Sequence, residues 1–272
     1  MAFEPIGERH AIQNVTFTLV FDDPFTETDI GRISHGSSSW SSFLPKEERA
    51  QFVQMLFGEQ PAGAPPPPPP PVGIKYSRMN PDGTSGWQLS FNQNQVSVHC
   101  STYTRWESVW GSAKSVLRDA LKVISNGNRN LLHLNLQIVD VFEWKGNPTD
   151  MSADKLFQTE GDFFPRTVVD FGPYWHLHNG YFQKINFSSS GPLSNAKTLN
   201  RIHIDANTQN DRNLVAINHT LRTDSTLPTL EVSESTETDY LDVVFSKLHS
   251  LNKEALAGLL TDEIQARIHL NG

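Results

Sequence analysis

The stretch LLHLNLQIVDVFEW, residues 131–144, decides the fold of this chain. Apolar residues take every second position over most of it, and polar residues such as His133 and Gln137 stand between them. Because successive side chains of a strand point to opposite faces, this alternation predicts a long strand with one buried face. Asp140 falls on the buried side of that strand.

A helix is predicted just before this strand, beginning near the motif Thr104-Arg105-Trp106-Glu107. Apolar residues recur there at steps of three and four, which is the spacing of one helix face. The threonine and the glutamate fit a capping box, and Gly127 is well placed to end the helix. We expect the paired Trp106 and Trp110 to anchor this helix over a sheet rather than to hold a cofactor.

Alternating and β-branched stretches predict further strands. Their ranges are 12–21, 74–79, 87–91, 96–100, 167–171, 174–187, 197–207, 213–221 and 229–232. A short helix is predicted over 45–57, because Pro45 suits a first helical turn. The chain from Tyr240 onward is also predicted to be helical, with Thr261 as a cap before its last turn.

Together these elements predict an α+β fold in which curved antiparallel sheets pack against long helices. Strand, helical segment, strands and long helix occur once before and once after about residue 128, which predicts two structurally similar halves, 1–128 and 129–272. Residues 61–72 contain the proline run Pro65 to Pro71, which cannot donate helix or ladder hydrogen bonds. We interpret this run as a semi-rigid surface insertion; a docking site for a partner's aromatic groove is the alternative.

The composition excludes several classes of protein. The chain has 272 residues, of which 37% are hydrophobic, so it can build a core. No run approaches the roughly 18 apolar residues of a membrane span, and the start from Met1 to His10 does not resemble a signal peptide. The single cysteine, Cys100, favours a reducing compartment, so we expect a cytoplasmic protein. The net charge of −8 offers no global attraction for nucleic acid, which we do not expect as a partner.

The common signatures of enzymes are absent from the sequence, which has no phosphate-binding Gly-rich loop, nucleophile elbow or His-Glu-x-x-His helix. Histidines at strand spacing remain. His176 and His178 share one face of a predicted strand, and His203 and Asp205 share a face of another. With His219 from the next strand and a matching register, they could surround Zn²⁺ or another divalent metal. The alternative is that these side chains only line solvated strand faces, because register cannot be read from sequence.

Three further residues are candidates for binding. Asp140 lies on an apolar face, where a carboxyl is either paired or functionally tuned, although a bulge or strand end would also explain it. Trp144 and Trp175 could form the rim of a recognition surface, because tryptophan is enriched among interface anchors. The stretch 224–242 carries six acidic residues and no Lys or Arg, which favours a basic partner or a solvated face.

Several short motifs resemble a known group of proteins. They are Trp106-Glu107 leading to Trp144, the stretch Tyr174-Trp175-His176 to Gly180-Tyr181-Phe182, and the ending Leu248-His249 with Leu260-Thr261-Asp262-Glu263. In these motifs the chain is similar, over nearly its whole length, to a sporadically distributed bacterial family of uncharacterised proteins of about this size. The proline run is an insertion relative to that pattern. The resemblance implies no catalytic residues, and it implies an accessory role in defence or mobile-element biology.

The sequence therefore supports two main hypotheses. The first is a non-enzymatic cytoplasmic binding protein without a cofactor, whose recognition surface on the strand side binds a protein partner or a small ligand. The second is a metal-dependent hydrolase that uses His176, His178, His203 and Asp205, in which Asp205 or Asp170 would orient a metal-bound water. A third hypothesis is a scaffold that works as a homo-oligomer through its C-terminal helices.

Overall fold

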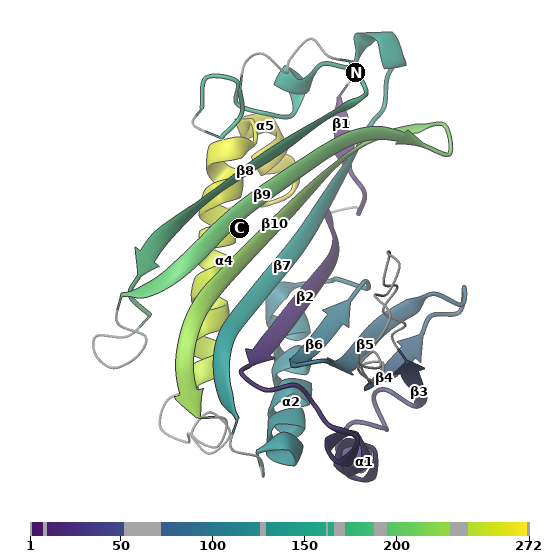
Figure 1. Ribbon diagram of the computed structural model, residues 1–272. Coiled ribbons are helices and arrows are strands. Elements are labelled where there is room, and N and C mark those ends of the chain that lie inside the picture. Colours follow the sequence, from purple (N-terminus) through teal and green to yellow (C-terminus); the bar gives the residue numbers. More distant parts are fainter. Residues whose placement is uncertain are drawn as a thin grey trace, which may run out of the picture.

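The computed structural model contains an antiparallel sheet with helices packed on one of its faces (Figure 1). It describes residues 2–7, 10–51, 72–125, 129–161, 163–165, 172–187, 195–228 and 239–270. The strands in these ranges are β1 (Phe3–Pro5), β2 (Ile12–Phe21), β3 (Lys46–Gln51), β4 (Val72–Met79), β5 (Ser85–Asn92), β6 (Gln95–Cys100), β7 (Asn130–Trp144), β8 (Trp175–Ile185), β9 (Ala196–Gln209) and β10 (Arg212–Pro228). They form one sheet in the order β3-β4-β5-β6-β2-β7-β10-β9-β8, and β1 pairs with β7 beside this path.

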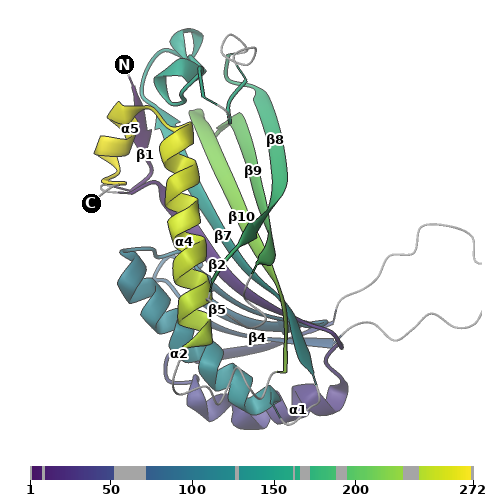
Figure 2. The same cartoon turned by 90° about the vertical axis from the view of Figure 1, so that its left-hand side faces the viewer.

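The helices that cover the sheet come from three parts of the chain. They are α1 (Glu27–Gly36), α2 (Trp106–Ile124), α4 (Tyr240–Leu259) and α5 (Asp262–Arg267), with short 3₁₀ turns η1 (Ser37–Ser39), η2 (Pro148–Asp150) and η3 (Ala153–Lys155). Figure 2 shows α2 and α4 on the same side of the sheet. None of the described helices combines the length and the apolar character that a membrane crossing requires. The prediction of an α+β fold with antiparallel strands is confirmed.

The strand β7 confirms the prediction made from residues 131–144. Every second residue from Leu134 to Trp144 is buried, as the alternation of the sequence requires. β7 pairs with β2 on one side and with β10 on the other, so it lies inside the sheet. A slip of β7 by one residue would move its buried apolar side chains to the opposite face. The alternation therefore fixes the register of β7 against β2 and β10.

Buried apolar side chains form two clusters on the helix-covered face. The first cluster includes residues of α1, α2 and the beginning of α4, and the second includes residues of α5 and the end of α4. Along β7, Ile138 belongs to the first cluster and Phe142 to the second, so Asp140 lies at their boundary. α4 contributes Leu248 to the first cluster and Leu256 to the second, and thereby joins them.

The arrangement does not support two similar halves. β2, from the N-terminal part of the chain, pairs with β7 from the C-terminal part, and the first cluster draws residues from both parts. The described strands form one sheet, whereas the sequence predicted several sheets. A domain boundary near residue 128 stays a prediction.

The predicted helix over 45–57 is wrong where the structure describes it. Residues 46–51 form β3, which pairs with β4 in unbroken register. Lys46 and Lys75 both contact the carboxylate of Glu48, at 3.1 and 3.0 Å, so opposite charges on neighbouring positions support this pairing. Short local patterns cannot reveal such a partner because it is distant in the sequence.

The helix α2 is confirmed, but its predicted cap is not. Arg105 occupies the N-cap position of α2, and its side chain makes no capping hydrogen bond. Thr261 occupies the N-cap position of α5, as predicted, but its side chain makes no capping hydrogen bond either. Trp110 is buried and donates a hydrogen bond to Asp242, and Trp106 stacks on His249 with ring centroids 3.8 Å apart. Both tryptophans therefore anchor α2, as predicted. The predictions at Gly127, the proline run, 167–171 and 229–232 lie outside the described residues.

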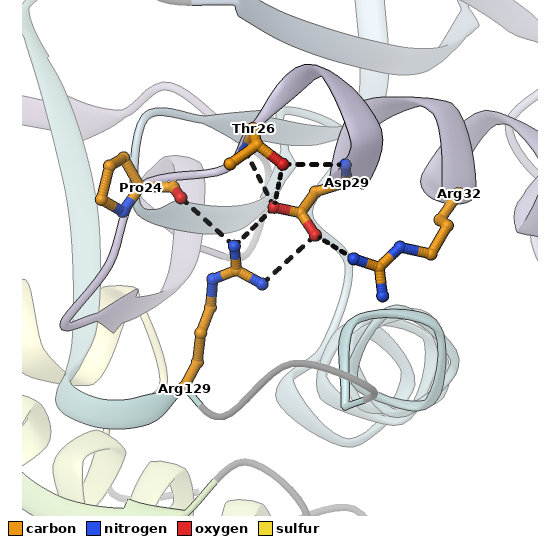
Figure 3. A network of polar contacts seen from close by, with 5 residues as sticks. All are labelled: Pro24, Thr26, Asp29, Arg32 and Arg129. Carbon is orange, nitrogen blue, oxygen red and sulfur yellow. Dashed lines mark hydrogen bonds and ion pairs between the residues drawn. The ribbon is translucent and has the colours of Figure 1, made fainter.

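A buried ion pair joins α1 to the beginning of β7 (Figure 3). Asp29 accepts hydrogen bonds from the backbone N–H and hydroxyl of Thr26, at 2.9 and 2.8 Å, and from Arg32 at 2.7 Å. Arg129 reaches the same carboxylate at 2.5 Å and also donates to the carbonyl of Pro24. Burial alone would raise the pKa of Asp29, but the hydrogen bonds from Thr26 and Arg129 outweigh burial and lower the pKa.

Candidate functional site

The sheet has an open face, which we define as the face opposite the helices and which faces the viewer in Figure 1. Its side chains alternate along each strand with those of the core, and they line up in rows because paired residues stand opposite each other. One row crosses the sheet through Gly180, Arg201, Thr220, Gln137, Thr16, His99, Gln88, Ser77 and Lys46. Apart from Gly180, this row is polar across the whole width of the sheet.

In the middle of the open face, side chains bind one another. Thr16 and His99 lie 2.9 Å apart between Oγ1 and Nδ1, and Gln137 Nε2 donates to Asn218 Oδ1 at 2.9 Å. Burial lowers the pKa of His99, which favours its neutral ring beside Thr16. Each of these four side chains already has a polar partner and is therefore less suited to take up a ligand.

At the β8 end, the register brings together four of the residues singled out in the sequence. His176 stands opposite Asp205, and His178 stands opposite His203. The rings of His178 and His203 stack with centroids 5.1 Å apart, and His203 Nε2 lies 3.3 Å from Asp205 Oδ2. The strand pairing that the metal hypothesis required is therefore present on the open face.

His219, the fifth residue of the proposed metal site, lies on the opposite face. It is buried, and its ring nitrogens lie 2.8 Å from the side-chain amides of Asn252 and Asn200. Burial lowers the pKa of His219 to about 4, so its ring is neutral and donates its single ring N–H to one of these two amide oxygens. The alternation of Val215 and Leu221 already placed position 219 on the apolar side.

The five residues therefore do not form one ligand set. Across the ranges that the structure describes, no three His, Cys, Asp or Glu side chains are placed so that they could hold a metal ion. The histidines on β8 and β9 remain exposed polar groups beside one another. Their position at the edge of the sheet makes them available for contact with a partner.

Asp140 is a buried carboxyl on the covered face and does not contribute to the open face. Its Oδ2 has no hydrogen-bond partner among the described residues, and burial raises its pKa to about 7. Ile12 and Ile217 stand opposite it on the neighbouring strands. β2 has an irregular register between Ile12 and Asn14, so a bulge does lie beside Asp140.

The two tryptophans proposed as a recognition rim lie on the covered side. Trp144 is buried against Phe3, with ring centroids 5.1 Å apart, and its indole N–H donates to the carbonyl of Asn147 at 2.9 Å. Trp175 is partly buried, with its ring edge-on to that of Phe164 at 5.6 Å. Both side chains support the second cluster instead of forming a rim.

The sequence pattern does not reveal that β8 is an edge strand. One side of β8 pairs with β9, and the other side has no strand against it in the described part of the chain. Five large apolar side chains are exposed in the described residues, and three of them belong to β8 or adjoin it: Tyr174 at 68%, Tyr181 at 39% and Phe182 at 53% exposure. The consecutive residues Tyr181 and Phe182 could have indicated this edge. Neighbouring residues of a strand point to opposite faces, so this pair places an apolar side chain on each face of β8.

The β8 end is also locally basic. β8 itself contains no Asp or Glu, and on the open face it carries Lys184 beside Lys197 of β9. The ammonium of Lys197 lies 4.3 Å from the centroid of the exposed Phe182 ring. Arg201 follows on the same face of β9. In a chain with a net charge of −8, this is a distinct local environment.

The other edge of the sheet, β3, has a different composition. Its sequence is KEERAQ, in which four of six residues are charged, and Glu48 is already paired with two lysines. Charged residues and short length are devices that protect a sheet edge from unwanted pairing. β8 has eleven residues, only one of which is Lys and none acidic or arginine, so it lacks this protection.

Comparisons of the chain with protein-family models, with curated proteins and with solved structures gave no match. The resemblance to a bacterial family therefore stays a prediction.

Proposed function

We propose that this chain is a non-enzymatic binding protein that recognises a protein partner at the β8 end of its sheet. The observation that carries the proposal is the composition of β8, an edge strand with exposed aromatic side chains and no acidic residue. Exposed aromatic residues are typical of the anchors of protein interfaces, and at an edge strand Tyr181 on one face and Phe182 on the other both border the same open edge. The proposal keeps the first of the two main hypotheses and locates its surface.

The histidine cluster fits a recognition role. His176 and His178 are exposed on β8, and His203 lies beside them with Asp205 as its neighbour. Exposed imidazoles can donate or accept hydrogen bonds without a metal. The pairing of β8 with β9 is the one observation that favours the hydrolase hypothesis. Among the described residues, the His and Asp side chains form no group suited to a metal ion.

The scaffold hypothesis placed an interface on the C-terminal helices, and the burial of α4 does not favour it. Leu248 and Leu256 lie in the two core clusters, so these apolar side chains already have their contacts within the chain. β8, at the end of the sheet, supplies the better candidate surface.

Site-specific photocrosslinking in the cells that naturally make the protein tests the proposal. We would introduce a photoreactive phenylalanine in place of Phe182 and, as a matched control, in place of Met79, which is also exposed but lies on β4. We expect one discrete crosslinked product from position 182 and none from position 79. The product should disappear when Tyr181→Ser is added. Equal products from both positions, or none from position 182, would contradict the proposal.

A further inference from the structure

We infer that the partner contributes an extended segment in which acidic and apolar residues alternate, and that this segment pairs with β8 as an additional strand. The inference deepens the proposed function and rests on it. Three properties of β8 support it: its regular backbone, the charges on its open face, and the apolar side chains on its covered face.

The backbone of β8 is suited to strand addition. All eleven residues pair with β9, from Trp175↔Ala206 to Ile185↔Ala196, with no shift in register. In a regular strand, the backbone groups that do not face one neighbour face the other side. β8 therefore presents a regular row of N–H and C=O groups along its outer edge, which an extended segment can use for hydrogen bonds.

The open face of β8 selects acidic residues. His176, His178 and Lys184 point to this face. Behind them on β9, Lys197 stands opposite Lys184 and Asp205 stands opposite His176, so the positive charge is concentrated at the Lys184 end. Side chains on neighbouring strands interact most strongly when they stand opposite each other, and opposite charges there are favourable. A segment that places Glu or Asp on this face would pair with the positive charge of β8.

The covered face of β8 selects apolar residues. Leu177 packs against the second cluster and Ile185 against the first, and both are only partly buried. Tyr181 lies on the same face and is 39% exposed. An added strand would cover the outer sides of these three side chains with its own residues, and apolar residues there would remove more apolar surface from water.

The charges of β8 also argue against a second copy of β8 as the occupant. Because β8 contains basic and imidazole groups but no acidic residue, no register of two β8 strands would place opposite charges across from each other. Like charges that face each other across strands are unfavourable. An acidic segment, in contrast, can place a carboxylate opposite Lys184 without bringing like charges together across the strands.

Binding of synthetic peptides to the full chain tests the inference. The probe is an eleven-residue peptide in which glutamate alternates with valine and threonine, and its control has lysine at each glutamate. Fluorescence anisotropy should show binding of the acidic peptide and affinity for the lysine peptide weaker by about tenfold or more. Lys184→Glu should weaken binding of the acidic peptide severalfold, whereas Lys122→Glu, an exposed change on α2, should not.

Two further peptides test strand addition without changing the protein. Each carries N-methyl groups on alternate residues, one on the odd and one on the even positions, so that only one of them loses the N–H groups that face β8. We expect one peptide to lose binding and the other to retain it. If both bind as well as the parent, if neither charge change matters, or if the acidic peptide does not bind, the inference is wrong. A crosslinked product at position 182 together with such a result would leave the proposed function standing and remove only strand addition.

Discussion

Asp29, in the first turn of α1, and Asp140, on the strand β7 inside the sheet, are both buried, with 5% and 2% of each residue exposed. Asp29 is surrounded by donors, among them Arg129 and Thr26, and its pKa is lowered. Asp140 has isoleucines opposite it on both neighbouring strands, and burial raises its pKa to about 7. A buried aspartate is therefore charged or neutral according to the hydrogen-bond donors that the fold places around it. Burial alone does not decide this.

The largest expected effect comes from removing the partner of Asp29. Arg129→Met should lower the free energy of unfolding at pH 7 by about 3–5 kcal/mol, because it leaves a buried carboxylate without its principal counter-charge. Urea unfolding followed by circular dichroism would measure this loss. As a control, Arg118→Met breaks an ion pair in which the Arg118 side chain is 46% exposed, and it should cost at most about 1 kcal/mol. Similar losses in both variants would show that Asp29 does not depend on Arg129.

The next effect has the opposite sign. The folded protein holds the proton of Asp140 up to about pH 7, whereas the unfolded chain releases it near the ordinary pKa of 3.8. The unfolded state therefore binds fewer protons between these values, and the contribution of Asp140 to stability falls as pH rises from about 4 to about 7. Asp140→Asn removes this fall. It should raise the free energy of unfolding at pH 8 by about 2–4 kcal/mol and leave it nearly unchanged at pH 4.

Unfolding of both proteins at pH 4, 6 and 8 would measure the difference. The free energy gained by the variant should grow with pH across this series. A constant difference, or a variant that is less stable at pH 8, would mean that Asp140 is charged in the folded protein and has a partner.

The smallest expected loss of stability comes from Thr26, which is a hydrogen-bond partner of Asp29. Thr26 caps α1, and its backbone N–H and hydroxyl both donate to Asp29. Thr26→Ala should cost about 1 kcal/mol at pH 7. Because the lowered pKa of Asp29 contributes stability that disappears as pH falls through the folded pKa, the cost should shrink in strong acid.

Thr261 is a matched control for this prediction. It occupies the same capping position at α5, but its side chain makes no capping hydrogen bond. Thr261→Ala should therefore change the free energy of unfolding by less than Thr26→Ala in the same urea titrations. Equal losses would show that the hydrogen bonds made by the Thr26 hydroxyl, to the carboxylate and from the backbone N–H of Asp29, contribute nothing particular.

Some features of the molecule could be read from single segments. The alternation of residues 131–144 predicted β7, and the spacing around Trp106 and Trp110 predicted α2, because both patterns report which side of one element is buried. The same alternation placed Asp140 on the buried side. Val215 and Leu221 are apolar and lie an even number of residues from His219, so the alternation also places His219 on the buried face of its strand. The metal hypothesis did not take this position into account.

Other features depend on which segments meet. Residues 46–51 were predicted as helix and form β3, since their partner β4 lies beyond the proline run. The pairing of His178 with His203 required the register of β8 on β9, which a pattern within one strand does not contain. The exposure of Tyr181 and Phe182 followed from the position of β8 at the end of the sheet.

The local pattern of apolar and polar residues was enough to identify which side of β7 and of α2 faces the core, because this pattern follows the geometry of the backbone. Only the tertiary structure decided the order of the strands, the partners of Asp29, the isolation of Asp140 and the open edge at β8. These depend on contacts between residues far apart in the chain, and their free energies are set by the neighbours that the fold brings together.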